Sequence, residues 1–200
     1  HLRKNTKQNK AFKAFVTEGG ESLDMLAVYD ALQSHLKAKG KDCWGWPVFP
    51  EEYKDYHNPA VAKFKKANAG NVKFYLFLQW IAAQQLEAAS SKATECGMTI
   101  GLYRDLAVGV SEGSAEIWGN KDLYCVDASV GAPPDILGPL GQNWGLPPMD
   151  PRKLYEQAYQ PIIDLFAANM ASSGSLRIDH VMALLRLWWV VKGDDAKEGG

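Results

Sequence analysis

Two short apolar segments, each following a helical segment and ending in charged residues, constrain the fold of this chain most. Residues 98–106 include Arg104-Asp105 near their end, and residues 176–180 read Leu-Arg-Ile-Asp-His. Both have the length of a strand, and the first is apolar enough to be a buried one. The order helix, strand, long loop, helix, strand therefore predicts an α/β fold, with charged residues at the carboxyl ends of the strands.

A mostly helical region of about 70 residues is expected to precede these strands. Residues 22–39 carry apolar side chains at helical spacing, and Ser22 and Gly40 are suited to begin and end that helix. Asn58-Pro59 then begins a shorter helix, because asparagine is a good N-cap and proline is tolerated in the first turn. The first twenty residues show no clear period and carry no prediction.

The remainder, residues 71–200, is expected to be a partial barrel segment. A helix over 72–93 precedes the first strand, and a helix beginning at Asp150-Pro151 precedes the second. Residues 107–150 between them are rich in glycine and proline and form a long loop. Active sites of (β/α)8 (TIM) barrels lie at the carboxyl ends of the strands, and two or three strands cannot close such a barrel. The expected domains are thus a helical subdomain, 1–70, and a barrel segment.

Composition argues against several other classes of protein. A chain of 200 residues with 46% hydrophobic and 22% charged residues is typical of a soluble globular protein, and a net charge of −1 favours neither nucleic acid nor an anionic membrane as partner. It has no apolar run of transmembrane length and no signal-peptide pattern. Three widely spaced cysteines predict neither a disulfide framework nor a zinc site, so a cytoplasmic location is expected. Because the chain starts with His1 and stops at a polar tail, both ends are expected to be cut from a longer protein.

Asp179 is the candidate nucleophile. If its segment is a strand, Arg177 and Asp179 lie on one face, and a carboxylate beside a guanidinium keeps a low pKa and stays ionised. A structural ion pair at a strand end is the alternative, and composition alone slightly favours it. An aspartate nucleophile fits retaining glycoside chemistry, which also requires a second carboxyl group about 5–5.5 Å away.

The long loop supplies a second candidate group. It contains Gly-Ala-Pro-Pro-Asp at 131–135 and Gly-Gln-Asn-Trp-Gly at 141–145, and so many glycines and prolines fix an irregular path. An aromatic face beside amides and a carboxylate is typical of sugar binding, and the loop displays such a set: Asp135, Gln142 and Trp144. A rigid surface loop with a buried tryptophan is an equally supported alternative. Residues 112–116 are expected to form a plain surface loop, although Glu116 and Trp118 would also suit a pocket wall.

These stretches together resemble the bacterial 4-alpha-glucanotransferases, also called amylomaltases or disproportionating enzymes, of the α-amylase clan. The resemblance spans about residues 72–191 and is carried, in order, by Gln79-Trp80 with Ala82, Gln85 and Leu86, by the loop from Gly131 to Pro147, and by Leu176 to His180. It implies a retaining (β/α)8-barrel enzyme that transfers a segment of a 1,4-alpha-D-glucan, such as a maltodextrin, to a new 4-position in an acceptor. It implies neither an organic cofactor nor a metal, and the sequence contains neither His-x-His nor His-Glu-x-x-His.

The resemblance also implies roles for single residues. Asp179 becomes the nucleophile that forms a glucosyl-enzyme intermediate, Arg177 its bonded partner, and His180 a sugar contact. The loop that closes over the glucan would contain Asp135, Gln142 and Trp144. The alternatives are another α-amylase-clan glycoside hydrolase and a non-catalytic glucan-binding fragment.

The sequence departs from the family pattern in two ways. Many members carry Asp-Ser-Ala-Asp/Glu-hydrophobic-Trp, in which the first Asp contacts sugar; here that residue is Gly113, and no role is carried over to it. The family's general acid/base Glu and transition-state-stabilising Asp lie on later strands and are expected after Gly200. Because general acid catalysis contributes roughly 10²–10⁴-fold, the chain alone is expected to be nearly inactive.

Overall fold

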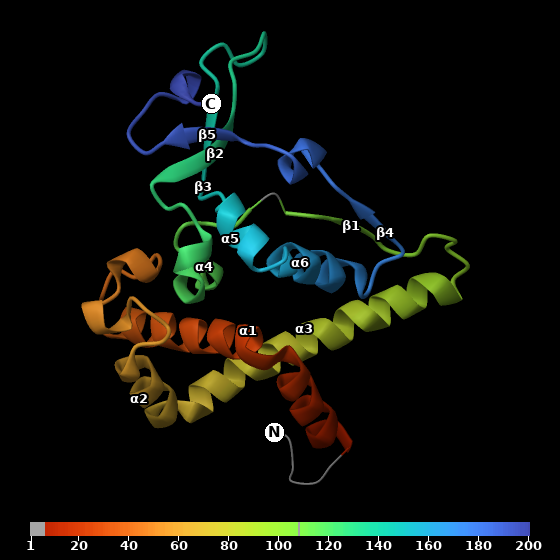
Figure 1. The fold of residues 1–200 in the computed structure, drawn as a ribbon. Helices are drawn as coiled ribbons and strands as arrows, with labels where there is room; N and C mark the ends of the chain where they lie inside the picture. Colours follow the sequence, from red (N-terminus) through yellow and green to blue (C-terminus); the bar gives the residue numbers. More distant parts are fainter. Residues whose placement is uncertain (1–6, 108) are drawn as a thin grey trace. The chain divides into compact units, whose positions relative to one another are not determined.

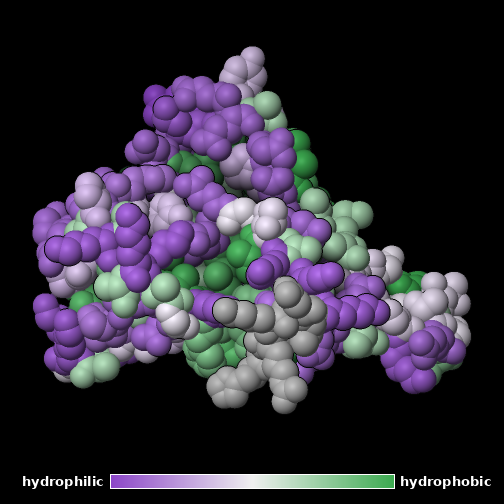
Figure 2. Space-filling model, turned by 90° about the horizontal axis from the view of Figure 1, so that it is seen from below, coloured by the Kyte–Doolittle hydropathy of each residue, from purple (hydrophilic) through white to green (hydrophobic). Residues whose placement is uncertain are grey.

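The computed structural model describes residues 7–107 and 109–200 (Figure 1). They group into two compact units, one containing residues up to 88 with 113–119, the other containing 89–112 with 120–200. The helical region expected over 1–70 falls within the first unit, and a boundary at residue 70 stays a prediction. Figure 2 shows hydrophilic residues over most of the face seen from below, with smaller hydrophobic areas between them. Within the described ranges, no helix is both long and apolar enough to cross a membrane.

Helices build the first unit. The longest, α1 (Lys7–Ala38), is kinked at Gly20, whose φ of 55° is compatible with glycine. The sequence predicted only the part of α1 that follows this kink, because adjacent glycines weaken a helical pattern. The remaining elements are α2 (Pro59–Ala67), the part of α3 (Ala69–Glu95) up to Ala88, α4 (Ala115–Gly119) and the 3-10 turns η1 (Trp46–Val48) and η2 (Glu51–Tyr53). As predicted, the side chain of Asn58 caps α2, accepting a hydrogen bond from the Ala60 N–H at 2.9 Å.

Trp118 anchors α4 in the core of the first unit. Its side chain is 1% exposed, and its ring lies 5.4 Å from that of Tyr29 on α1 and 5.4 Å from that of Tyr56. The indole Nε1–H donates to the Tyr53 carbonyl at 2.8 Å. The plain surface loop expected over 112–116 is therefore wrong in part, since α4 begins at Ala115 and three of its five residues are buried.

Two small sheets build the second unit. The first pairs β1 (Tyr103–Asp105) with β4 (Ser175–Arg177) in parallel. The second is antiparallel, with the order β3 (Gln142–Leu146), β2 (Ala128–Ala132) and β5 (Trp188–Val191). Sequence patterns predicted the first pair and missed the second sheet, because its strands are short and two of them contain glycine.

The first strand is shorter and less buried than predicted. Regular structure covers only Tyr103–Asp105, and Ile100 and Tyr103 are 61% and 66% exposed. The prediction of a buried strand over 98–106 is therefore wrong. Within the described part of the chain β1 has β4 as its only hydrogen-bonded neighbour, and no second strand shields its other edge.

The helix predicted to begin at Asp150-Pro151 is two helices, α5 (Pro151–Glu156) and α6 (Gln160–Met170). Asp150 caps α5 as expected, accepting from the Arg152 N–H at 2.8 Å. The break lies before Pro161, which has no N–H to continue the hydrogen bonds of α5 but is tolerated in the first turn of α6. Tyr159, with φ at 60°, turns the chain before α6 begins.

Candidate functional site

The carboxyl ends of β1 and β4 bring two aspartates to one arginine. In the parallel register Asp105 lies beside Arg177, so the two strands end at the same edge, as the sequence predicted. Arg177 Nη1 lies 2.6 Å from Asp105 Oδ2, and its Nη2 lies 2.8 Å from Asp179 Oδ2. The hydrogen bond that Arg177 donates to Asp105, together with the charges of both carboxylates, raises the pKa of Arg177. The guanidinium is therefore fixed as a cation between two acids.

Asp179 lies just past the end of β4, in the turn that follows. One oxygen accepts from Arg177, and the other, Oδ1, accepts from the backbone N–H of His180 at 3.1 Å. Both oxygens are thus oriented by donors, while the side chain remains 45% exposed. A carboxylate that is held in this way and is still accessible can approach an electrophile.

Trp144 on β3 meets His180 although 35 residues separate them in the sequence. Their ring centroids lie 5.0 Å apart at an interplanar angle of 67°, an edge-to-face arrangement. The Trp144 indole N–H donates to Gln142 Oε1 on the same strand at 2.9 Å. The structure therefore joins five of the six residues singled out from the sequence: Arg177, Asp179, His180, Trp144 and Gln142.

The sixth, Asp135, accepts hydrogen bonds inside its own loop. Its Oδ1 accepts from the Leu137 N–H at 2.9 Å and from the Gly138 N–H. This arrangement shapes the turn between β2 and β3, where Ile136 and Leu137 are almost fully exposed. In the structure the carboxylate of Asp135 organises this loop.

Asp105 is the residue of this group that sequence reasoning did not select. Its signal was present, since Arg104-Asp105 ends the first predicted strand. Only the parallel register decides which of the pair reaches Arg177. Arg104 instead donates through Nη1 to the Asn169 carbonyl near the end of α6, at 3.2 Å, where a cation is favourable.

Gly113, in the first unit, lies where no side chain fits. A Cβ atom there would lie 2.7 Å from Cζ3 of the Trp44 ring and 3.1 Å from the Cα of Gly45. The hydroxyl of Tyr29 donates to the Gly113 carbonyl, which fixes this backbone further. The indole of Trp44 therefore occupies the space that a side chain at position 113 would need.

We expect Gly113→Asp to lower the free energy of unfolding of the first unit by about 1–3 kcal/mol, because overpacking forces ring and backbone apart. Urea unfolding followed by tryptophan fluorescence measures this. Gly70→Ala is the matched control, since a Cβ at Gly70 meets no atom within 4 Å. Equal midpoints for the Gly113→Asp variant and the wild-type protein would contradict the close packing.

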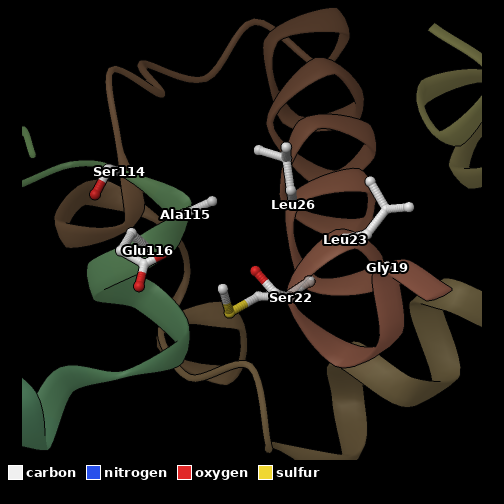
Figure 3. A pocket seen from close by; sticks show the side chains of 8 residues that line it. Gly19, Ser22, Leu23, Leu26, Ser114, Ala115 and Glu116 are labelled. Atoms are coloured by element: carbon white, nitrogen blue, oxygen red, sulfur yellow. The ribbon is translucent and has the colours of Figure 1, made fainter. Parts of the chain in front are cut away.

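Glu116 lines a pocket of about 380 Å³ between α1 and α4, within the first unit (Figure 3). The α1 wall contributes Gly19, Ser22, Leu23, Met25 and Leu26, and the facing wall contributes Ser114, Ala115 and Glu116. Burial raises the pKa of Glu116 above the usual value for a glutamate. Glu116 thus lies in a pocket wall, the alternative to the plain surface loop that the sequence favoured, whereas Trp118 is a core residue.

Glu116→Gln should change the pH dependence of stability. A carboxyl group whose pKa is raised by folding binds protons more tightly in the folded state, so it costs stability as pH rises through that pKa. The variant should therefore gain stability over the wild-type protein between about pH 4 and pH 7. Urea unfolding across this range tests this, with the exposed Glu52→Gln as control; identical pH profiles of the wild-type protein and the Glu116→Gln variant would refute it.

No group of three or more His, Cys, Asp or Glu side chains within 7–107 and 109–200 is placed to hold a metal ion. The chemistry available at the β1–β4 edge is that of an oriented carboxylate, a guanidinium, an imidazole and an indole.

Comparison with known proteins assigns the family. The family model for 4-alpha-glucanotransferase, glycoside hydrolase family 77, matches residues 1–200. The chain is 40% identical over 195 residues to a 4-alpha-glucanotransferase of Haemophilus influenzae, covering 96% of the chain and 28% of that protein. It is 38% identical over 189 residues to one of Mycobacterium tuberculosis, covering 94% of the chain and 25% of that protein. The chain thus spans about a quarter of the length of these relatives.

Two solved structures share its fold. An amylomaltase from Corynebacterium glutamicum aligns with 100% of the chain and 25% of its own, at 31% identity and a TM-score of 0.79. An amylomaltase from Streptococcus agalactiae, in complex with acarbose, aligns with 98% of the chain and 40% of its own, at 20% identity and a TM-score of 0.84. The resemblance seen in the sequence is confirmed: the chain belongs to the 4-alpha-glucanotransferase family.

Proposed function

We propose that the chain is the nucleophile-bearing part of a cytoplasmic 4-alpha-glucanotransferase with a (β/α)8 barrel, in which β1 and β4 are two of the barrel strands. The enzyme transfers a segment of a 1,4-alpha-D-glucan to a new 4-position in an acceptor glucan or glucose. One observation carries the proposal: in a chain of this family, Arg177 and the His180 N–H orient both oxygens of an accessible Asp179.

In the first step Asp179 attacks the anomeric carbon of the bound glucan. A bond forms between its carboxylate oxygen and that carbon while the bond to the leaving 4-oxygen breaks, which gives a covalent glucosyl-enzyme. The leaving oxygen needs a proton from a second carboxyl group, which the proposal assigns to a part of the enzyme outside these residues. Arg177 keeps an opposite charge beside Asp179 and fixes its direction.

In the second step the 4-hydroxyl of an acceptor attacks the same carbon, and Asp179 leaves as a carboxylate. Two displacements restore the α configuration. Transfer exceeds hydrolysis when water is kept out of the site. The loop between β2 and β3, which Asp135 shapes, performs this task, and His180, Gln142 and Trp144 contact the sugar.

Product analysis of the full-length enzyme with maltotriose tests the proposal. Transfer gives glucose together with maltodextrins longer than maltotriose. Glucose and maltose alone would contradict it and would indicate a hydrolase of the α-amylase clan. Residues 1–200 by themselves should give no products, because no second carboxyl group is assigned there to protonate the leaving oxygen.

A further inference from the structure

His180 has a backbone conformation that its residue type disfavours. Its φ of 53° and ψ of 46° lie in the left-handed region. Among the described residues, two others that are not glycine also have a positive φ, Ala158 and Tyr159. Its own N–H is the donor to Asp179 Oδ1. Strained residues persist only where surrounding contacts hold them, so a contact that holds His180 bears on the carboxylate beside it.

The His180 side chain lies near Asp179 itself, with Nδ1 3.6 Å from Oδ1, and a second contact comes from a different sheet. Trp144 belongs to β3, which is paired to β2, and it packs edge-to-face against the imidazole at 5.0 Å between ring centroids. The indole cannot turn freely, because its N–H is held by Gln142 Oε1 at 2.9 Å. An unbroken series of contacts thus runs from Gln142 through Trp144 and His180 to Asp179.

We propose that Trp144 is a positioning residue that holds His180 in its left-handed conformation and through it orients Asp179, with Gln142 fixing the indole. The effect of this positioning on catalysis rests on the proposed function. The positioning itself goes beyond that function, because Trp144 can hold His180 with no sugar in the site. A movement of β3 or of the loop before it would then alter the orientation of the nucleophile directly.

The first test uses the full-length protein without any sugar. In NMR spectra, Trp144→Ala should move the backbone Cα and carbonyl carbon signals of His180, which report its φ and ψ, away from their left-handed values, and Gln142→Met should move them less. Trp144→Phe keeps an aromatic edge and should preserve most of the wild-type positions. Tyr155→Ala on α5, which removes an exposed aromatic ring, is the control and should leave the His180 signals unmoved. Unmoved signals in the Trp144→Ala protein would overturn the proposal.

The second test is a double-mutant cycle on the rate of maltotriose disproportionation. Trp144→Ala should lower kcat by about tenfold when His180 is present and by less than about twofold in the His180→Ala background. A tryptophan that only binds sugar would give the same loss in both backgrounds, mainly in KM, and would overturn the inference. If the wild-type enzyme shows no transfer, the proposed function fails; the NMR result without sugar still decides on the role of Trp144.

Discussion

Asp179→Asn should reduce the transferase activity of the full-length enzyme by roughly 10⁴-fold in kcat, the scale seen when a nucleophile is removed. An amide is too weak a nucleophile to form the glucosyl-enzyme, yet it has nearly the same size as the carboxylate and can still accept from Arg177. Binding of maltodextrin should therefore persist while turnover is lost. Initial rates with maltotriose, with product formation followed over hours, measure the loss.

The control for this variant is Asp164→Asn on α6. Asp164 is also exposed and also accepts a side-chain hydrogen bond, from Gln160 at 2.7 Å, and an amide can keep that bond. It should retain wild-type kcat. A fall of less than tenfold for Asp179→Asn would show that another group is the nucleophile and would refute the proposed mechanism.

Trp118→Ala should lower the free energy of unfolding of the first unit by about 3–5 kcal/mol, the usual cost of removing a buried aromatic side chain. The indole is 1% exposed, and its loss opens a cavity beside Tyr29 and Tyr56. It also leaves the Tyr53 carbonyl without its donor. Urea unfolding followed by circular dichroism gives the difference.

Two comparisons separate the causes of that loss. Trp118→Phe removes the N–H but fills much of the space, so its effect should be clearly smaller. Phe74→Ala on α3 deletes an aromatic side chain that is 53% exposed and should cost less than about 1 kcal/mol. If Trp118→Ala were no more destabilising than Phe74→Ala, the assignment of Trp118 as the anchor of α4 would be wrong.

Local sequence signals predicted the helix starts that a single side chain and its near neighbours determine. Asn58 and Asp150 begin helices because their own side chains satisfy N–H groups two residues away. Pro161 is a local signal of the same kind, because a proline interrupts a helix. It would have predicted the break between α5 and α6, but the sequence prediction did not use it. The second sheet was missed because its pairings join residues far apart, as between β2 and β5, and short strands carry little pattern of their own.

For the candidate site, the sequence alone predicted the ion pair of Arg177 with Asp179, because the two residues are only two positions apart. The structure contains this pair, although Asp179 lies in the turn after β4 and not on an extended segment. The sequence also predicted that charged residues lie at the carboxyl ends of two strands. Only the tertiary structure decided that Asp105, and not Arg104, contacts Arg177, and that Trp144 packs on His180. These contacts depend on strand register and on the approach of separate sheets, which many residues set together and no short motif encodes.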